Sequence, residues 1–187
     1  MSSYMSYKRW IFVAIGLFGI GIASGLATPP AIITELFSED LAAIRELAAI
    51  LGPFQITTAI FIFLKNVSAL LLSFVFSPIL CLVPILALTA NGWLISFISV
   101  YVVQEESLGF LLAGLLPHGI FELPALIIGE AAALSFGALT IVALVSKEKK
   151  DLLLPGLKQN LRYLLVACAL LLPAAIIETY ITPLFLS

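Results

Sequence analysis

The sequence predicts an all-α fold, a polytopic transmembrane helical bundle of about five spans. Hydrophobic residues make up 62% of the chain, charged residues only 11%, and the mean hydropathy is +1.19. Soluble domains are instead about 45–50% apolar and about 25% charged. Short polar loops also divide the chain into long apolar runs, and each crossing of a bilayer needs about 20 residues. We therefore expect one integral membrane domain over residues 1–187, with the lipid bilayer as its main partner.

The first expected span covers residues 10–27. The basic pair Lys8-Arg9 precedes it, as in a secretory signal, but the apolar run is longer than the roughly 7–15 residues of a signal core. We therefore expect the segment to be retained. Gly21 and Gly25 are spaced as GxxxG, which lets helix backbones approach closely in membranes. This face should pack against another helix, either of the same chain or of a second copy in a homodimer.

Two further spans are expected after an interruption at Thr28-Pro29-Pro30. Residues 38–51 are amphipathic and too short to cross a bilayer, which is typical of a helix lying in the membrane interface. The spans over 53–76 and 79–103 are separated only by a tight break at Ser77-Pro78. We expect these two spans to be antiparallel neighbours.

The segment from residue 108 to Val145 is too long for one span and slightly short for two with a solvated turn. Proline lacks the amide donor that a helix interior requires, and Pro117, Gly119 and Pro124 interrupt the segment. We expect a re-entrant or interfacial helix over 108–116, a break, and a span over 119–145. Alternatively, Pro117 opens a helix that Pro124 kinks, or Pro124 itself opens the span.

The last span is expected over 161–185, after a basic loop. Lys8 and Arg9 and the basic residues between Lys147 and Arg162 fall at two ends that five crossings place on one side. Basic residues in short loops favour the cytoplasmic side. The chain should therefore be a multi-pass protein of the cell membrane, with its N-terminus cytoplasmic and its C-terminus outside. Its net charge of −2 does not favour nucleic acid as a partner.

Several polar residues within the spans form a candidate intramembrane site. Ionisable groups at this depth cost about 2.5–3.5 kcal/mol and need a partner, water or a function. Either they line a pocket that binds or relays something, or they form a structural network that sets helix register. In both cases we expect Lys65 within salt-bridge or water-bridge reach of Glu122 or Glu130. Glu178 is expected to snorkel or to cap its helix. The candidate residues are Lys65, Asn66, Asn91, His118, Glu122 and Glu130.

The sequence predicts neither an enzyme nor a metal or other cofactor. His118 and Glu122 have the helical spacing of metal ligands, but no third ligand is recognisable beside them. Motifs such as HExxH, GxSxG and a phosphate-binding glycine loop do not occur. Cys81 and Cys168 lie in apolar runs and are expected to be free packing thiols.

Three motifs carry a family resemblance: Phe63-Leu64-Lys65-Asn66-Val67, the pair Asn91-Gly92, and the string from Leu116 to Ala125 that reads LPHGIFELPA. They resemble the stage II sporulation protein M family, an integral membrane domain of unknown function in archaea and bacteria. The resemblance extends over nearly the whole chain. It implies a multi-spanning protein and, in sporulating relatives, a complex with peptidoglycan-remodelling enzymes during engulfment. The family positions carried over are Asn66, Asn91, Gly92, His118, Gly119, Glu122 and Pro124.

Two functional hypotheses follow. The leading one is a membrane scaffold or assembly subunit for partner proteins, in which the polar residues hold the bundle together. The alternative is a small transporter or channel component with a polar intramembrane site at Lys65, His118 and Glu122.

Overall fold

The computed structural model describes residues 6–29 and 52–186. Among these residues the regular elements are helices, without a strand, and five helices are long and apolar enough to cross a membrane. The all-α, five-span fold is therefore confirmed. The interfacial helix expected over 38–51 lies outside the described residues. The long helices are α1 (Tyr7–Leu26), α4 (Ile56–Phe76), α5 (Leu82–Glu105), α6 (Leu108–Val145) and α7 (Leu153–Tyr180).

Two short helices flank the last span. The 3-10 helix η1 (Lys147–Leu152) leads into α7, and α8 (Thr182–Phe185) follows it. Helix α7 thus begins at Leu153 rather than at residue 161, and it ends at Tyr180. Lys158 and Arg162 are exposed on its first turns. Long basic side chains at a helix end can cover apolar surface with their stems and keep their charge in water, so they do not shorten the helix.

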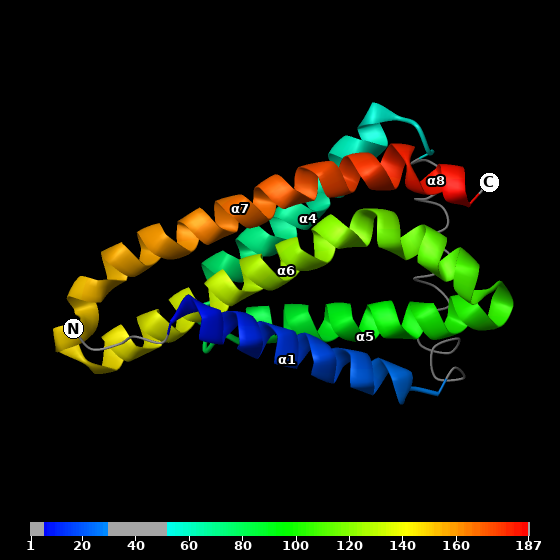
Figure 1. The fold of residues 1–187 in the computed structure, drawn as a ribbon. Helices are drawn as coiled ribbons and strands as arrows, with labels where there is room; N and C mark the ends of the chain where they lie inside the picture. Colours follow the sequence, from blue (N-terminus) through cyan, green and yellow to red (C-terminus); the bar gives the residue numbers. More distant parts are fainter. Residues whose placement is uncertain (1–5, 30–51, 187) are drawn as a thin grey trace.

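Most of the basic residues lie at one end of the bundle. The start of α1, with Lys8 and Arg9, lies at the same end as the connection between α6 and α7 (Figure 1). That connection holds η1 and leads to Lys158. We call this the basic end. The opposite end contains α8 and the C-terminus (Figure 1).

Helix α6 is the centre of the bundle, because it contacts α1, α4, α5, α7 and α8. One buried core lies between α4, α6 and α7, and another between α1, α5 and α6, and Leu126 of α6 packs against both. Small side chains on α6 allow this crowding, since they let neighbouring helices approach closely. The small buried residues are Gly119, Ala125, Gly129, Ala131, Ala132, Ala133, Gly137 and Ala143.

The glycine face of α1 packs against α5 of the same chain. A Cβ atom added to Gly21 would lie 2.2 Å from the carbonyl oxygen of Thr89, and one added to Gly25 would lie 2.5 Å from that of Trp93. On the facing helix, a Cβ atom on Gly92 would lie 2.2 Å from the carbonyl oxygen of Phe18. The two backbones are therefore in direct contact at these positions.

The helix break expected around Pro117 and Pro124 does not occur. Both prolines lie inside α6, a single helix of 38 residues, so no separate helix ends at residue 116. At 1.5 Å per residue α6 is about 57 Å long, nearly twice the thickness of a hydrocarbon core. Figure 1 shows that the first half of α6 is curved. Proline bends a membrane helix without ending it when packed neighbours satisfy the freed backbone groups.

Candidate functional site

Three ionisable side chains meet where the start of α6 passes the end of α7. His118 and Glu122 come from α6 and Glu178 from α7, and one ligand atom of each lies within 4.8 Å of the others. The His118 Nε2 atom is 3.7 Å from Glu122 Oε2, and the two side chains are 14% and 33% exposed. We call these three residues the His118 cluster. It lies toward the end of the bundle that holds α8.

Two neighbouring polar groups orient the cluster. The Asn66 amide on α4 donates a hydrogen bond to Glu122 Oε1 at 3.1 Å. Thr182 Oγ1, at the start of α8, lies 3.5 Å from His118 Nδ1. Asn66 contacts Glu122 through Oε1, and Thr182 contacts His118 through Nδ1. The remaining atoms, His118 Nε2 and Glu122 Oε2, face each other. Such outer contacts commonly fix the orientation of metal-binding histidine and carboxylate groups.

The His118 cluster has the donor set of a divalent cation site. One imidazole and two carboxylates are ligands that zinc and manganese accept, at about 2.0–2.2 Å from the ion. Two ligands of one ion at this distance are at most about 4.4 Å apart, so the ligand atoms, which lie within 4.8 Å of one another, would move closer together on binding one ion. Glu122 and Glu178 together carry two negative charges when ionised, which matches a divalent ion.

Glu178 is the functional candidate that the sequence interpretation missed. It was expected to snorkel or to cap α7, and instead it supplies the third group beside His118 and Glu122. The available signal was the antiparallel order of consecutive spans, which brings the start of one span beside the end of the next. His118 lies early in α6 and Glu178 late in α7.

The prediction of a direct salt bridge for Lys65 is wrong, and the water-bridged contact stays a prediction. Within the described residues, Lys65 forms no salt bridge with Glu122 or Glu130. It is exposed on α4 and lies close enough to Glu178 for an electrostatic interaction. The reason is geometric: Asn66 faces α6, and an adjacent residue on a helix points about 100° away.

Glu130 lies outside the His118 cluster. It is eight residues beyond Glu122 on α6, which corresponds to about 12 Å along the helix. Its side chain is 1% exposed and accepts a hydrogen bond from the Ser73 hydroxyl of α4. Together with the bond from Asn66 to Glu122, this contact joins α4 to α6 at two levels. Glu130 therefore has a structural partner.

Asn91 is also separate from the cluster. It is exposed on α5, and its amide donates to the Ala87 carbonyl of the same helix at 2.7 Å. Gly119 is buried on α6, and an added Cβ atom would meet nothing closer than Leu115 Cγ at 4.0 Å. The structure thus brings Asn66, His118 and Glu122 together and leaves Lys65 at the edge of the site.

Comparison with known proteins identifies the family. The family model described as Stage II sporulation protein M matches residues 11–183. An uncharacterised protein of Methanocaldococcus jannaschii is 37% identical over 92 residues, which are 49% of this chain and 50% of that protein, so the match spans about half the length of this relative. No solved structure matches significantly. Because the family model covers nearly the whole chain, the protein belongs to the stage II sporulation protein M family of membrane proteins.

Proposed function

We propose that this protein is a membrane transport component that binds a divalent cation at the His118 cluster. The observation that carries the proposal is the convergence of His118, Glu122 and Glu178 within 4.8 Å, on two helices long and apolar enough to cross a membrane. Ionisable groups in membrane spans are costly, and they commonly mark ion pathways. A structural bond between two helices needs only one polar pair, whereas this cluster gathers three ionisable groups.

The charges around the cluster support reversible binding. A divalent ion would neutralise Glu122 and Glu178, and Lys65 lies near enough to Glu178 to supply part of that positive charge when the ion leaves. In a medium of low dielectric constant, the two carboxylates need a nearby positive charge both when the ion is bound and after it leaves. A site that remains partly neutralised after release is suited to transport, because a transported ion must be able to leave.

The curved half of α6 has two carbonyl oxygens without a helical amide partner, which would be available as further oxygen ligands. Pro117 and Pro124 lack the amide hydrogens that would bond to the carbonyl oxygens four residues earlier, those of Ala113 and Ile120. These two carbonyls precede and follow His118 in the sequence. Unpaired helix carbonyls in broken or bent membrane helices commonly coordinate cations.

Calorimetry of the purified protein with zinc and with manganese tests the site. We expect His118→Ala, Glu122→Gln and Glu178→Gln each to weaken binding at least about tenfold, since each removes one ligand. Glu148→Gln, an exposed acidic position on η1 at the basic end, is the matched control and should bind normally. Unchanged affinity in all three cluster variants would rule out this site.

Uptake into proteoliposomes tests transport itself. Vesicles loaded with a metal-sensitive dye should report cation entry with the wild-type chain and with Glu148→Gln, and not with Glu122→Gln. Thermal unfolding in detergent must accompany this measurement. If Glu122→Gln is as stable as the wild type and still loses uptake, the residue acts on the cation rather than on the bundle.

A second candidate is the assembly subunit, favoured by the two polar bonds that join α4 to α6. The bonds from Asn66 to Glu122 and from Ser73 to Glu130 support an architectural role for part of the polar set. The family resemblance implies protein partners in sporulating relatives. This role is preferred if the wild-type chain binds no divalent cation and Glu122→Gln mainly unfolds it.

We also propose that the basic end faces the cytoplasm and the C-terminus faces outside, in accord with the positive-inside rule. Single cysteines at Lys150 and at Leu186, in a chain whose Cys81 and Cys168 are replaced by serine, test this orientation. A membrane-impermeant maleimide added to intact cells should label the Leu186 position and not the Lys150 position. The reverse labelling pattern would invert the topology.

A further inference from the structure

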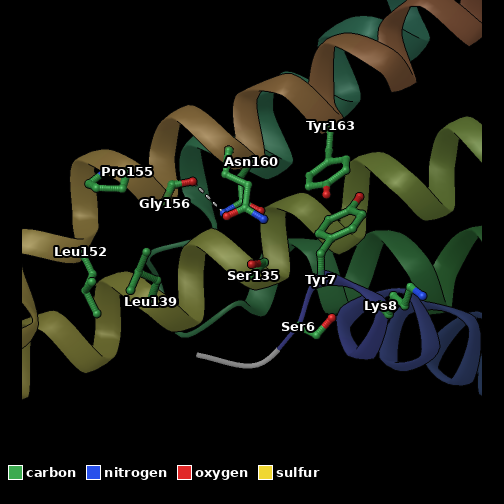
Figure 2. A pocket seen from close by; sticks show the side chains of 11 residues that line it. Ser6, Tyr7, Lys8, Ser135, Leu139, Leu152, Pro155, Gly156, Asn160 and Tyr163 are labelled. Carbon is green, nitrogen blue, oxygen red and sulfur yellow. Dashed lines mark hydrogen bonds between the residues drawn. The ribbon is translucent and has the colours of Figure 1, made fainter. Parts of the chain in front are cut away.

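A cavity of about 410 Å³ lies at the basic end, between the start of α1, the second half of α6 and the start of α7 (Figure 2). Asn160 of α7 lines it, eighteen residues before Glu178, which corresponds to about 27 Å along the helix. The cavity is therefore separate from the His118 cluster. It opens beside the exposed residues Ser6 and Lys8.

Asn160 is a buried polar residue with an unsatisfied acceptor. It is 4% exposed, and its Nδ2 atom donates to the Gly156 carbonyl oxygen at 2.9 Å, which sets the orientation of the amide. Its Oδ1 atom has no hydrogen-bond partner among the described residues. Figure 2 shows the side chain reaching from α7 toward Ser135 of α6, across the cavity. Buried acceptors in native proteins are nearly always paired, so a donor from an occupant is expected here.

On the α1 side, a ring stacking and a hydrogen bond hold the cavity wall together. The rings of Tyr7 and Tyr163 are stacked with centroids 3.5 Å apart, and the Tyr7 hydroxyl donates to the Ile128 carbonyl at 2.7 Å. Ser6 is the N-cap of α1, and its side chain makes no capping hydrogen bond. The N-terminus of a helix attracts anions, because its first amides point outward and its dipole is positive there.

Basic side chains lie at the cavity and beside it. Lys8 lines it, and an adjoining hollow, which shares Gln159 and Tyr163 with it, adds Lys158 and Arg162. Among the described residues, those that line the two hollows include no aspartate or glutamate. The local charge therefore favours an anionic occupant, and the buried Asn160 acceptor favours one that also carries a hydroxyl group.

We propose that this cavity binds a phosphate ester with a free hydroxyl, the chemistry of the glycerol-phosphate headgroup of an anionic lipid. The phosphate would face the basic side chains and the hydroxyl would donate to Asn160 Oδ1. A volume of about 410 Å³ is sufficient for such a group and falls within the usual range of ligand pockets. Basic pockets between membrane helices commonly hold anionic headgroups.

The test measures binding to the full chain in a neutral detergent, with short-chain phosphatidylglycerol as the probe and short-chain phosphatidylcholine as the comparison. Phosphatidylglycerol should bind at least about tenfold more tightly, because only its headgroup is anionic with free hydroxyls. Asn160→Ala should weaken that binding about tenfold. The matched control is Asn91→Ala, because Asn91 makes the same bond to the carbonyl four residues earlier, on exposed α5.

A double variant, Lys158→Ala with Arg162→Ala, tests the phosphate side and changes only exposed residues. This double variant still tests the proposal if the Asn160→Ala variant does not fold. Competition by soluble glycerol 3-phosphate would show that the headgroup alone is bound, and a lack of competition would assign the site to the intact lipid. Equal binding of the two lipids, or phosphatidylglycerol binding that neither variant weakens, overturns the proposal.

Discussion

The two halves of the bundle are held together by different means. Between α1 and α5, Gly21, Gly25 and Gly92 allow the two backbones to touch. Between α4 and α6, the side chains of Asn66 and Ser73 donate hydrogen bonds to glutamates. In a bilayer, lipid tails are as apolar as leucine, so helix association depends on close packing or on polar bonds. In this chain, close glycine contacts are prominent between α1 and α5, and side-chain hydrogen bonds to glutamates are prominent between α4 and α6. The half with these glutamate bonds also contains the His118 cluster.

The largest effect on stability is expected in the glycine half. Gly21→Ala places a Cβ atom 2.2 Å from the Thr89 carbonyl oxygen, so α1 and α5 must separate. We expect a loss of about 1–3 kcal/mol of unfolding free energy. Gly19→Ala, on the same helix with nothing within 4 Å of its Cβ position, is the matched control. It should be neutral or slightly stabilising in a detergent unfolding titration, and equal losses in the two variants would show that helix contact does not depend on Gly21.

A smaller loss is expected when the buried polar bond is removed. Ser73→Ala deprives Glu130 of its hydroxyl donor, and a buried carboxyl without a partner is unfavourable, so we expect about 1–2 kcal/mol. Ser68→Ala, at an exposed position of the same helix, should change stability by less than about 0.5 kcal/mol. Cation binding should be unaffected by both, since Glu130 lies outside the His118 cluster. Weakened cation binding in Ser73→Ala alone would place Glu130 in the site.

Asn66→Ala should have the smallest effect on stability among these variants and a large effect on cation binding. Asn66→Ala removes one interhelical hydrogen bond, worth about 0.6 kcal/mol in membrane proteins. It also frees Glu122 Oε1, so cation affinity should fall about 10–100-fold, as is usual for residues that orient a ligand. Asn91→Ala should alter neither quantity. Calorimetry and unfolding of both variants separate a role in the site from a role in packing.

Much of the fold follows from the sequence, because long apolar runs in a chain of this hydropathy can be satisfied only by helices that cross a bilayer. The continuity of α6 could not be predicted from the sequence. Pro117 and Pro124 each lack an amide donor, and whether a helix bends or ends there depends on contacts from neighbouring helices. Local sequence contains no information on those contacts.

The candidate site was partly predictable for the same reason. His118 and Glu122 share a face because they are four residues apart on one helix, and this holds without tertiary information. The contributions of Asn66, Glu178 and Thr182 depend on how α4, α7 and α8 pack against α6. Lys65 was assigned to the wrong partner because the rotation of α4 about its own axis determines whether Lys65 or Asn66 faces α6.

The uninterrupted α6 has a mechanical consequence. Its curved half contains His118 and Glu122, and its other half lines the cavity at the basic end through Ser135 and Leu139. The two sites are therefore connected by one continuous, hydrogen-bonded helix. If an occupant of one site shifts or bends α6, the other site changes shape as well. By thermodynamic linkage each occupant would then alter the affinity for the other by the same factor.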